Sequence, residues 1–79
     1  MSKPVKAKQL MKILEKLGFK GIRITGSHHR FVHSDGRKTS VPVHVSEPIG
    51  KGLLNKIIKK DVRISKKEFE ELLKQLILF

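Results

Sequence analysis

The sequence predicts an α+β fold in which helices cover one face of a three-stranded antiparallel sheet. Two segments carry apolar residues at helical spacing, and between them lies a region in which β-branched and polar residues alternate. The turn signal Asp35-Gly36 divides that region into the two strands of a hairpin. The chain has 79 residues, so we expect a single domain over residues 1–79 with a compact core.

The first helix is expected from Lys6 to Leu17, after a short mobile tail of residues 1–5. The apolar residues that recur on one helix face are Leu10, Ile13, Leu14 and Leu17, with Met11 beside them. Lysines occupy the opposite face, which is the pattern of an amphipathic helix. Gly18 then stands where a left-handed cap commonly ends a helix.

Three strands should follow the first helix. Residues 20–25 alternate between isoleucine and polar side chains, which favours a short strand. The hairpin comes next, with its first strand around residues 28–33 and its second from Lys38 to Val45. Pro42 cannot donate a hydrogen bond to a neighbouring strand, so the last strand should lie at the sheet edge or end there.

Two further helices complete the chain after a loop from Val45 to Gly52. The first should span about Lys51 to Lys60, and the apolar period breaks over residues 61–64. Ser65-Lys66-Lys67-Glu68 is a capping box that opens the last helix. The inward residues of these two helices should be Leu53, Leu54, Ile57, Ile58, Phe69, Leu72, Leu73 and Leu76. The resulting order, α-β-β-β-α with an extra C-terminal helix, is that of a double-stranded-RNA-binding domain.

The chain is strongly basic, with 18 lysines and arginines against 7 acidic residues and a net charge of +11. Such an excess attracts polyanions, so RNA, DNA, an anionic membrane or an acidic protein would each suit it. A lysine-rich surface that serves only solubility is the alternative. Cysteine is absent, which excludes disulfides and thiolate metal sites. No apolar run suits a membrane span or a signal peptide, so we expect a cytoplasmic protein.

Three of the four histidines lie on the first strand of the predicted hairpin. Alternation along a strand places His29 and His33 on the same face as Phe31, and it places His28 on the opposite face with Arg30. Because the large apolar Phe31 should face the core, His28 and Arg30 should face outward. There an imidazole could move protons at neutral pH. The guanidinium could stabilise negative charge on a reacting phosphate.

Other groups could assist at the same site. Backbone N–H groups at Gly26 and Ser27 could contact a phosphate, because glycine permits close approach of the backbone. His44 could be a second imidazole near the sheet. The lysines of the second helix, which are usually only solvated, could also track a phosphate backbone. They are Lys51, Lys56, Lys59 and Lys60.

A plainer interpretation is that His28 and His29 are polar residues at a strand end, and that His29 and His33 pack at the edge of the core. A zinc site built from the histidines has little support, because cysteine is absent and only Asp35 and Glu47 lie near them. The signatures of P-loops, dinucleotide folds, serine hydrolases and zincins are absent. We therefore expect neither a metal nor another cofactor.

Several short motifs occur in an order that is specific as a set, although each motif alone is common. They are Leu17-Gly18-Phe19, Gly26-Ser27-His28-His29, Asp35-Gly36-Arg37, Val41-Pro42-Val43-His44, Pro48-Ile49-Gly50 with Gly52-Leu53-Leu54, and Ile64-Ser65-Lys66-Lys67-Glu68-Phe69. Over residues 8–73 the chain thereby resembles the HicA family of mRNA interferase toxins. The resemblance implies a double-stranded-RNA-binding-like fold, ribosome-independent cleavage of mRNA and a cognate HicB antitoxin that masks the toxin.

The resemblance also implies an essential histidine in the Gly-Ser-His motif, which is His28 in this sequence. His29 takes that place where family members align through the second histidine of the pair. The segment Leu76–Phe79 is more hydrophobic than the resemblance leads us to expect. This suggests a homodimer contact or an antitoxin contact at the end of the chain.

The leading hypothesis is an endoribonuclease, in which His28 acts as general base or acid while an RNA 2′-hydroxyl attacks the adjacent phosphate. Arg30 and the lysine-rich helix would hold the RNA backbone. The rival hypothesis is a non-catalytic RNA-binding module of the same fold, which would retain RNA without cleaving it. A third is a DNA-binding helix-turn-helix formed by the two C-terminal helices, which a preference for duplex DNA over RNA would favour.

Overall fold

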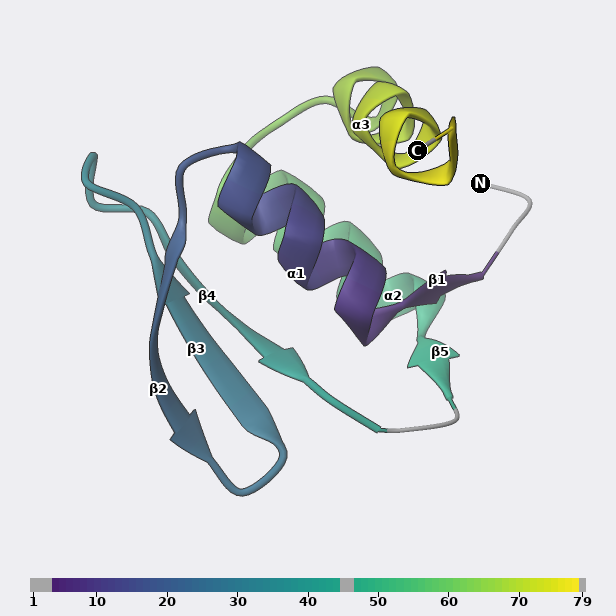
Figure 1. Ribbon diagram of the computed structural model, residues 1–79. Helices are drawn as coiled ribbons and strands as arrows, with labels where there is room; N and C mark the ends of the chain where they lie inside the picture. Colours follow the sequence, from purple (N-terminus) through teal and green to yellow (C-terminus); the bar gives the residue numbers. More distant parts are fainter. Residues whose placement is uncertain (1–3, 45–46, 79) are drawn as a thin grey trace.

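The computed structural model describes residues 4–44 and 47–78, with side chains up to residue 76. The elements follow in the order β1 (Val5–Lys6), α1 (Ala7–Lys16), β2 (Lys20–Thr25), β3 (His28–Val32), β4 (Lys38–Pro42), β5 (Pro48–Ile49), α2 (Lys51–Lys56), the π-helical segment η1 (Ile57–Val62) and α3 (Lys66–Leu78). Figure 1 shows this path. The order confirms the predicted α+β fold of the double-stranded-RNA-binding type, with α3 as the additional helix.

The main sheet has three antiparallel strands in the order β2-β3-β4. Phe31, in the central strand, pairs with Gly21 of β2 and with Thr39 of β4. The register between β2 and β3 shifts between Gly21 and Arg23. Ile22 is therefore an extra residue, and the predicted alternation along β2 is interrupted there. All six residues of β2 are exposed, so this strand projects beyond the helices.

The turn between β3 and β4 forms as the Asp35-Gly36 signal predicts. Gly36 has φ 102°, a left-handed conformation that glycine adopts without strain. Its N–H donates to the carbonyl of His33 over 3.0 Å, and the His33 N–H donates to the carbonyl of Arg37 over 2.8 Å. The Asp35 carboxylate accepts the backbone N–H of Arg37 at 3.0 Å and its Nε–H at 2.8 Å. The last strand was predicted to lie at the sheet edge or to end at Pro42, and β4 does both.

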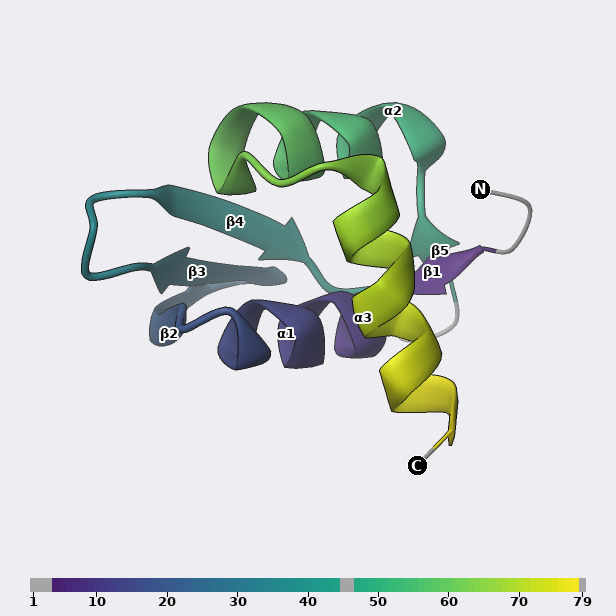
Figure 2. The same cartoon turned by 90° about the horizontal axis from the view of Figure 1, so that it is seen from above.

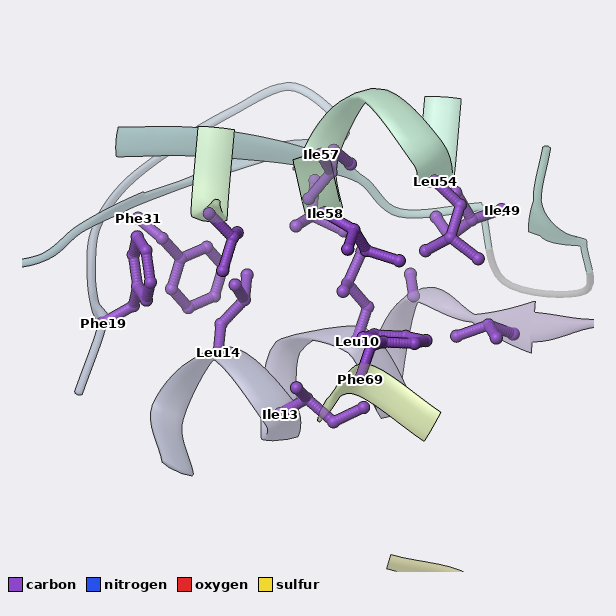
Figure 3. Close-up of a cluster of buried hydrophobic side chains, with 14 residues drawn as sticks. Leu10, Ile13, Leu14, Phe19, Phe31, Ile49, Leu54, Ile57, Ile58 and Phe69 are labelled. Carbon is purple, nitrogen blue, oxygen red and sulfur yellow. The ribbon is translucent and has the colours of Figure 1, made fainter. Parts of the chain in front are cut away.

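The core lies between one face of the sheet and the pair formed by α1 and α2–η1 (Figure 2). Burial of this apolar face, rather than helix propensity, holds such short helices in place. Figure 3 shows the side chains that meet there. The core residues that this figure labels are Leu10, Ile13, Leu14, Phe19, Phe31, Ile49, Leu54, Ile57, Ile58 and Phe69.

The prediction for the start of the chain was wrong. Val5 lies in β1 and is only 1% exposed, whereas the sequence placed it in a mobile tail. It pairs with Ile49 of β5, in a segment expected to be a loop. Residues 1–3 of the predicted tail lie outside the described residues, as do Val45 and Ser46 of the predicted loop. β4 ends at Pro42, so the predicted strand end at Val45 is also too far along the chain.

The second helix is longer than expected. The period was predicted to break at Asp61, but helical structure continues through η1 to Val62, which is 2% exposed. Arg63 then takes a left-handed conformation with φ 61°, which ends the helix. The serine half of the predicted capping box is confirmed, because the N–H of Glu68 donates to Ser65 Oγ over 3.0 Å.

The last helix, α3, packs against α1 and η1 (Figure 2). Phe69 is its buried anchor at 1% exposed, and Leu72, Leu73 and Leu76 are partly buried against the same core. The contact predicted for residues 76–79 falls largely on side chains outside the described part. Within residues 4–44 and 47–78, none of the helices combines the length and apolarity that crossing a bilayer requires.

Candidate functional site

The paired histidines lie at the start of β3 and face opposite sides of the sheet. His28 is exposed and pairs with Thr25 and Pro42. His29 is half-buried and pairs with Ile24 and with the fully buried Val41, on the face that packs against the helices. Because successive side chains of a strand point to opposite faces, the two adjacent imidazoles lie on opposite sides of the sheet.

A groove of about 670 Å³ runs between α1 and the β2–β3 hairpin, and His29 lines it. Four cations line the same groove, two from α1 and two from the strands; they are Lys8, Lys12, Arg23 and Arg30. Glu15 is the only carboxylate among the lining residues. The groove is therefore a concave, positively charged surface with an imidazole on its wall, and such a surface attracts phosphates.

The same groove has an apolar part. Met11 lines it from α1, and Ile22 and Ile24 line it from β2. These two isoleucines are 58% and 66% exposed, which is unusual for side chains of this size. Large exposed apolar residues beside a concave site are a feature of surfaces that bind a partner.

Sequence reasoning did not single out the cations of this groove other than Arg30. A signal existed, because Lys8 and Lys12 are one helical turn apart and so share a face of α1. What the sequence could not show is that this face is turned toward β2 and β3. That arrangement depends on how α1 lies across the sheet.

His33 has a structural role, as predicted for a histidine at the edge of the core. Its Nε2 lies 3.0 Å from the carbonyl of Leu17, and its Nδ1 lies 3.1 Å from the backbone N of Asp35. The neutral tautomer with hydrogen on Nε2 satisfies both, donating to the carbonyl and accepting from the N–H. The ring also packs edge-on against Phe19, with the ring centroids 5.1 Å apart. His33 thereby joins the end of α1 to the β3–β4 turn.

The loop before β3 is tied to the segment after β4. The N–H of Val43 donates to the carbonyl of Ser27 over 2.7 Å. This bond brings the Gly26-Ser27 step and His44, which is exposed, to the same end of the sheet as His28. Three of the sequence-predicted groups therefore lie near one another, at the end of the sheet where β2 turns into β3 (Figure 1).

The predicted lysine ridge is only partly brought to the sheet. Lys56 lines a second, smaller groove with Arg30 and with Lys38, a residue that the sequence did not single out. The other three lysines of the ridge are exposed on α2 and η1 but do not line this groove; they are Lys51, Lys59 and Lys60. Lys56 Nζ lies 3.7 Å from Asp61 Oδ2, a partly exposed ion pair of small energetic weight.

Comparison with known protein families gives a match over most of the chain. The family described as the HicA toxin of bacterial toxin–antitoxin systems matches residues 7–61, from the first residue of α1 almost to the end of η1. No curated protein matches the chain. The matched region covers well over half of the chain and contains the four histidines and both grooves, while α3 lies outside it. The chain therefore belongs to the family of HicA toxins of bacterial toxin–antitoxin systems.

Proposed function

We propose that this toxin is an endoribonuclease that cleaves mRNA, with an imidazole of β3 as its general acid or base. The observation that carries the proposal is the position of His29 on the wall of a groove that four cations also line. Membership of the HicA toxin family supports it, because the resemblance of the sequence to that family implies cleavage of mRNA. RNA phosphates supply the negative charge that such a groove favours.

The geometry favours His29 over His28 as the group that transfers the proton. His28 was the sequence-based assignment, and it is an exposed residue on the open face of the sheet. His29 is half-buried and lies in a concave site that four cations also line, where electrostatic interactions are stronger than in bulk water. Catalytic groups commonly occupy such positions. His28 remains the alternative, and both histidines can be tested separately.

The proposed reaction is an internal transfer of the phosphodiester. The imidazole removes the proton of a 2′-hydroxyl, whose oxygen forms a bond to the adjacent phosphorus while the bond from phosphorus to the 5′ oxygen breaks. The leaving oxygen takes a proton from solvent or from His44, which is exposed at the same end of the sheet. Arg30 and the groove lysines stabilise the negative charge of the transition state. The products are a 2′,3′-cyclic phosphate and a 5′-hydroxyl.

Binding of the RNA backbone is assigned to groups around this site. The backbone of Gly26 and Ser27 is open to solvent, and an added Cβ at Gly26 would meet no atom within 4 Å, so a phosphate can approach closely. Arg30 and the lysines of the ridge, Lys51, Lys56, Lys59 and Lys60, would add contacts along the strand. Each contact should appear in the salt dependence of binding.

Neutralisation by a HicB-type antitoxin is the second part of the proposal. A HicA toxin has a cognate antitoxin, and the exposed Ile22 and Ile24 offer it apolar contacts at the rim of the His29 groove. An antitoxin that is seated there would exclude RNA from the imidazole. The apolar residues from Leu76 to Phe79 would suit either the antitoxin or a second copy of the chain.

The direct test incubates the purified toxin with an RNA and with the same RNA carrying 2′-methoxy groups in place of the 2′-hydroxyls. We expect cleavage of the first only, because the methoxy oxygen has no proton to lose and cannot complete the attack. Binding of both RNAs without cleavage of either would instead identify a non-catalytic RNA-binding module. Preference for duplex DNA over both would overturn the assignment to RNA.

A further inference from the structure

A second basic groove lies beside β4, on the side of the sheet that η1 flanks. It has a volume of about 230 Å³, and its lining residues are Arg30, Lys38, Thr39, Ser40, Lys56 and Asp61. Two strands and the α2–η1 helix contribute to it, so it forms only when β3 and β4 pack beside that helix. Its cations come from three separate elements.

The charge of this groove is positive even though it contains a carboxylate. Three cations and one acid line it. Asp61 is engaged inside the protein, because Oδ2 accepts the hydroxyl of the buried Thr39 at 2.9 Å and lies 3.7 Å from Lys56 Nζ. The carboxylate is thereby fixed to the sheet, and the exposed Lys56 ammonium lies near it on the wall of the groove. The groove therefore has a net positive charge that can attract an external anion.

Arg30 connects the two grooves, since it lines both. It sits on the central strand, opposite Arg23 of β2 and Ser40 of β4. Neighbouring strands lie about 4.8 Å apart. The distance from the His29 groove to the second groove is therefore short compared with the length of an extended oligonucleotide. An RNA strand can therefore occupy both grooves at once.

We propose that an RNA strand whose reactive phosphate lies in the His29 groove continues over Arg30 into the second groove, where Lys38 and Lys56 bind a backbone phosphate. The proposal rests on the proposed function and adds to it a distal phosphate subsite. The lining contains lysines, hydroxyls and no aromatic ring. Such a site recognises the charge of the backbone and not the identity of a base.

The experiment compares two lengths of RNA. A labelled RNA of about eight nucleotides and a dinucleotide, both with 2′-methoxy groups so that neither is cleaved, are titrated with the wild-type toxin and with Lys38→Ala, Lys56→Ala and the double variant. Lys74→Ala on α3 is the matched control, because it removes one exposed lysine that lines neither groove. Affinity is measured over a range of salt concentrations, and circular dichroism confirms that each variant is folded.

For the longer RNA, each substitution in the groove should weaken binding and lower the slope of log K against log salt by about 0.7. The dinucleotide and the Lys74→Ala variant should show no change in slope. An equal loss for both lengths, or no loss for the longer RNA in the double variant, would overturn the distal subsite while leaving the nuclease proposal intact. Failure of the wild-type toxin to bind either RNA would overturn both.

Discussion

His28 and His29 are neighbours in the chain, yet they face opposite sides of β3: the first is exposed beside Pro42, and the second lines the groove under α1. Only the second shares a concave site with several cations. The two imidazoles therefore offer a natural pair of variants, with the same chemistry, the same strand and different surroundings.

His29→Ala should lower the rate of RNA cleavage by about 10²- to 10⁴-fold, which is the usual contribution of a general acid or base. His28→Ala should retain more activity than His29→Ala, because its side chain is remote from the groove wall. Single-turnover cleavage of a labelled RNA measures both rates. The opposite ranking would return the catalytic role to His28, and full activity in the double variant would remove both histidines from the mechanism.

Gly18→Ala should destabilise the fold for two separable reasons. Gly18 has φ 101°, and an added Cβ would lie 2.9 Å from His33 Nε2. The left-handed conformation alone costs about 1–2 kcal/mol for a residue with a Cβ. Gly36→Ala is the control, because Gly36 has φ 102° but no atom within 4 Å of the added Cβ. Urea denaturation should show a larger loss of unfolding free energy for Gly18→Ala.

The excess loss at Gly18 should depend on His33. Combining Gly18→Ala with His33→Ala removes the side chain that the new Cβ would strike, so the double variant should lose less free energy of unfolding than the sum of the single losses. Couplings between residues in contact are commonly about 0.5–3 kcal/mol. Strict additivity would show that the clash is relieved by a small movement of the imidazole.

Phe69→Ala should cost about 3–5 kcal/mol of unfolding free energy, which is the usual loss for a buried phenylalanine. Phe69 is 1% exposed and anchors α3, although α3 lies outside the family match. Lys74→Ala on the same helix should change stability by less than about 0.5 kcal/mol. A Phe69→Ala variant as stable as the wild type would mean that α3 does not share the core.

The acid dependence of stability should include a contribution from Asp35. The backbone N–H of Arg37 does most to hold the pKa of this carboxyl below its ordinary value of 3.8; desolvation opposes it, and the guanidinium of Arg37 adds to the lowering. A carboxyl with a lowered pKa in the folded state stabilises the fold above its unfolded pKa and loses that effect as the pH falls through the folded pKa.

Asp35→Asn should therefore lower the thermal denaturation temperature at neutral pH, and the difference from the wild type should shrink below about pH 4. Thermal scans from neutral pH to about pH 2 make the comparison. A difference that is constant over the whole range would show that the ionised carboxylate is not the cause. Ser34→Ala, which alters an exposed neighbour in the same turn, is a suitable control.

The sequence predicted what depends on local pattern. The stripe of Leu10, Ile13 and Leu14 identified α1, and Gly18 and Ser65 marked helix ends at their correct places. Both kinds of signal act over a few residues, so they can be read without knowing the fold. Alternation around Phe31 likewise predicted which face of β3 would be buried.

Features that depend on distant segments were missed. The pairing of Val5 with Ile49 joins residues far apart in the sequence, and two-residue strands carry almost no pattern of their own. The second helix continues to Val62, but the polar residues 59–61 before it interrupt the apolar pattern from which a helix is predicted. The second groove requires Lys38 of β4 and Lys56 of α2 to lie on the same surface. No spacing in the sequence predicts that they do.

The short ladder between β1 and β5 links the beginning of the chain to the helix that carries Lys56. Ile49 is followed directly by Gly50, the residue that caps α2. A fusion partner or a truncation that disturbs Val5 would thus loosen the start of α2. Lys56, at the other end of that helix, would then be less well positioned. Tags for biochemical work on this toxin are better attached where they leave that ladder undisturbed.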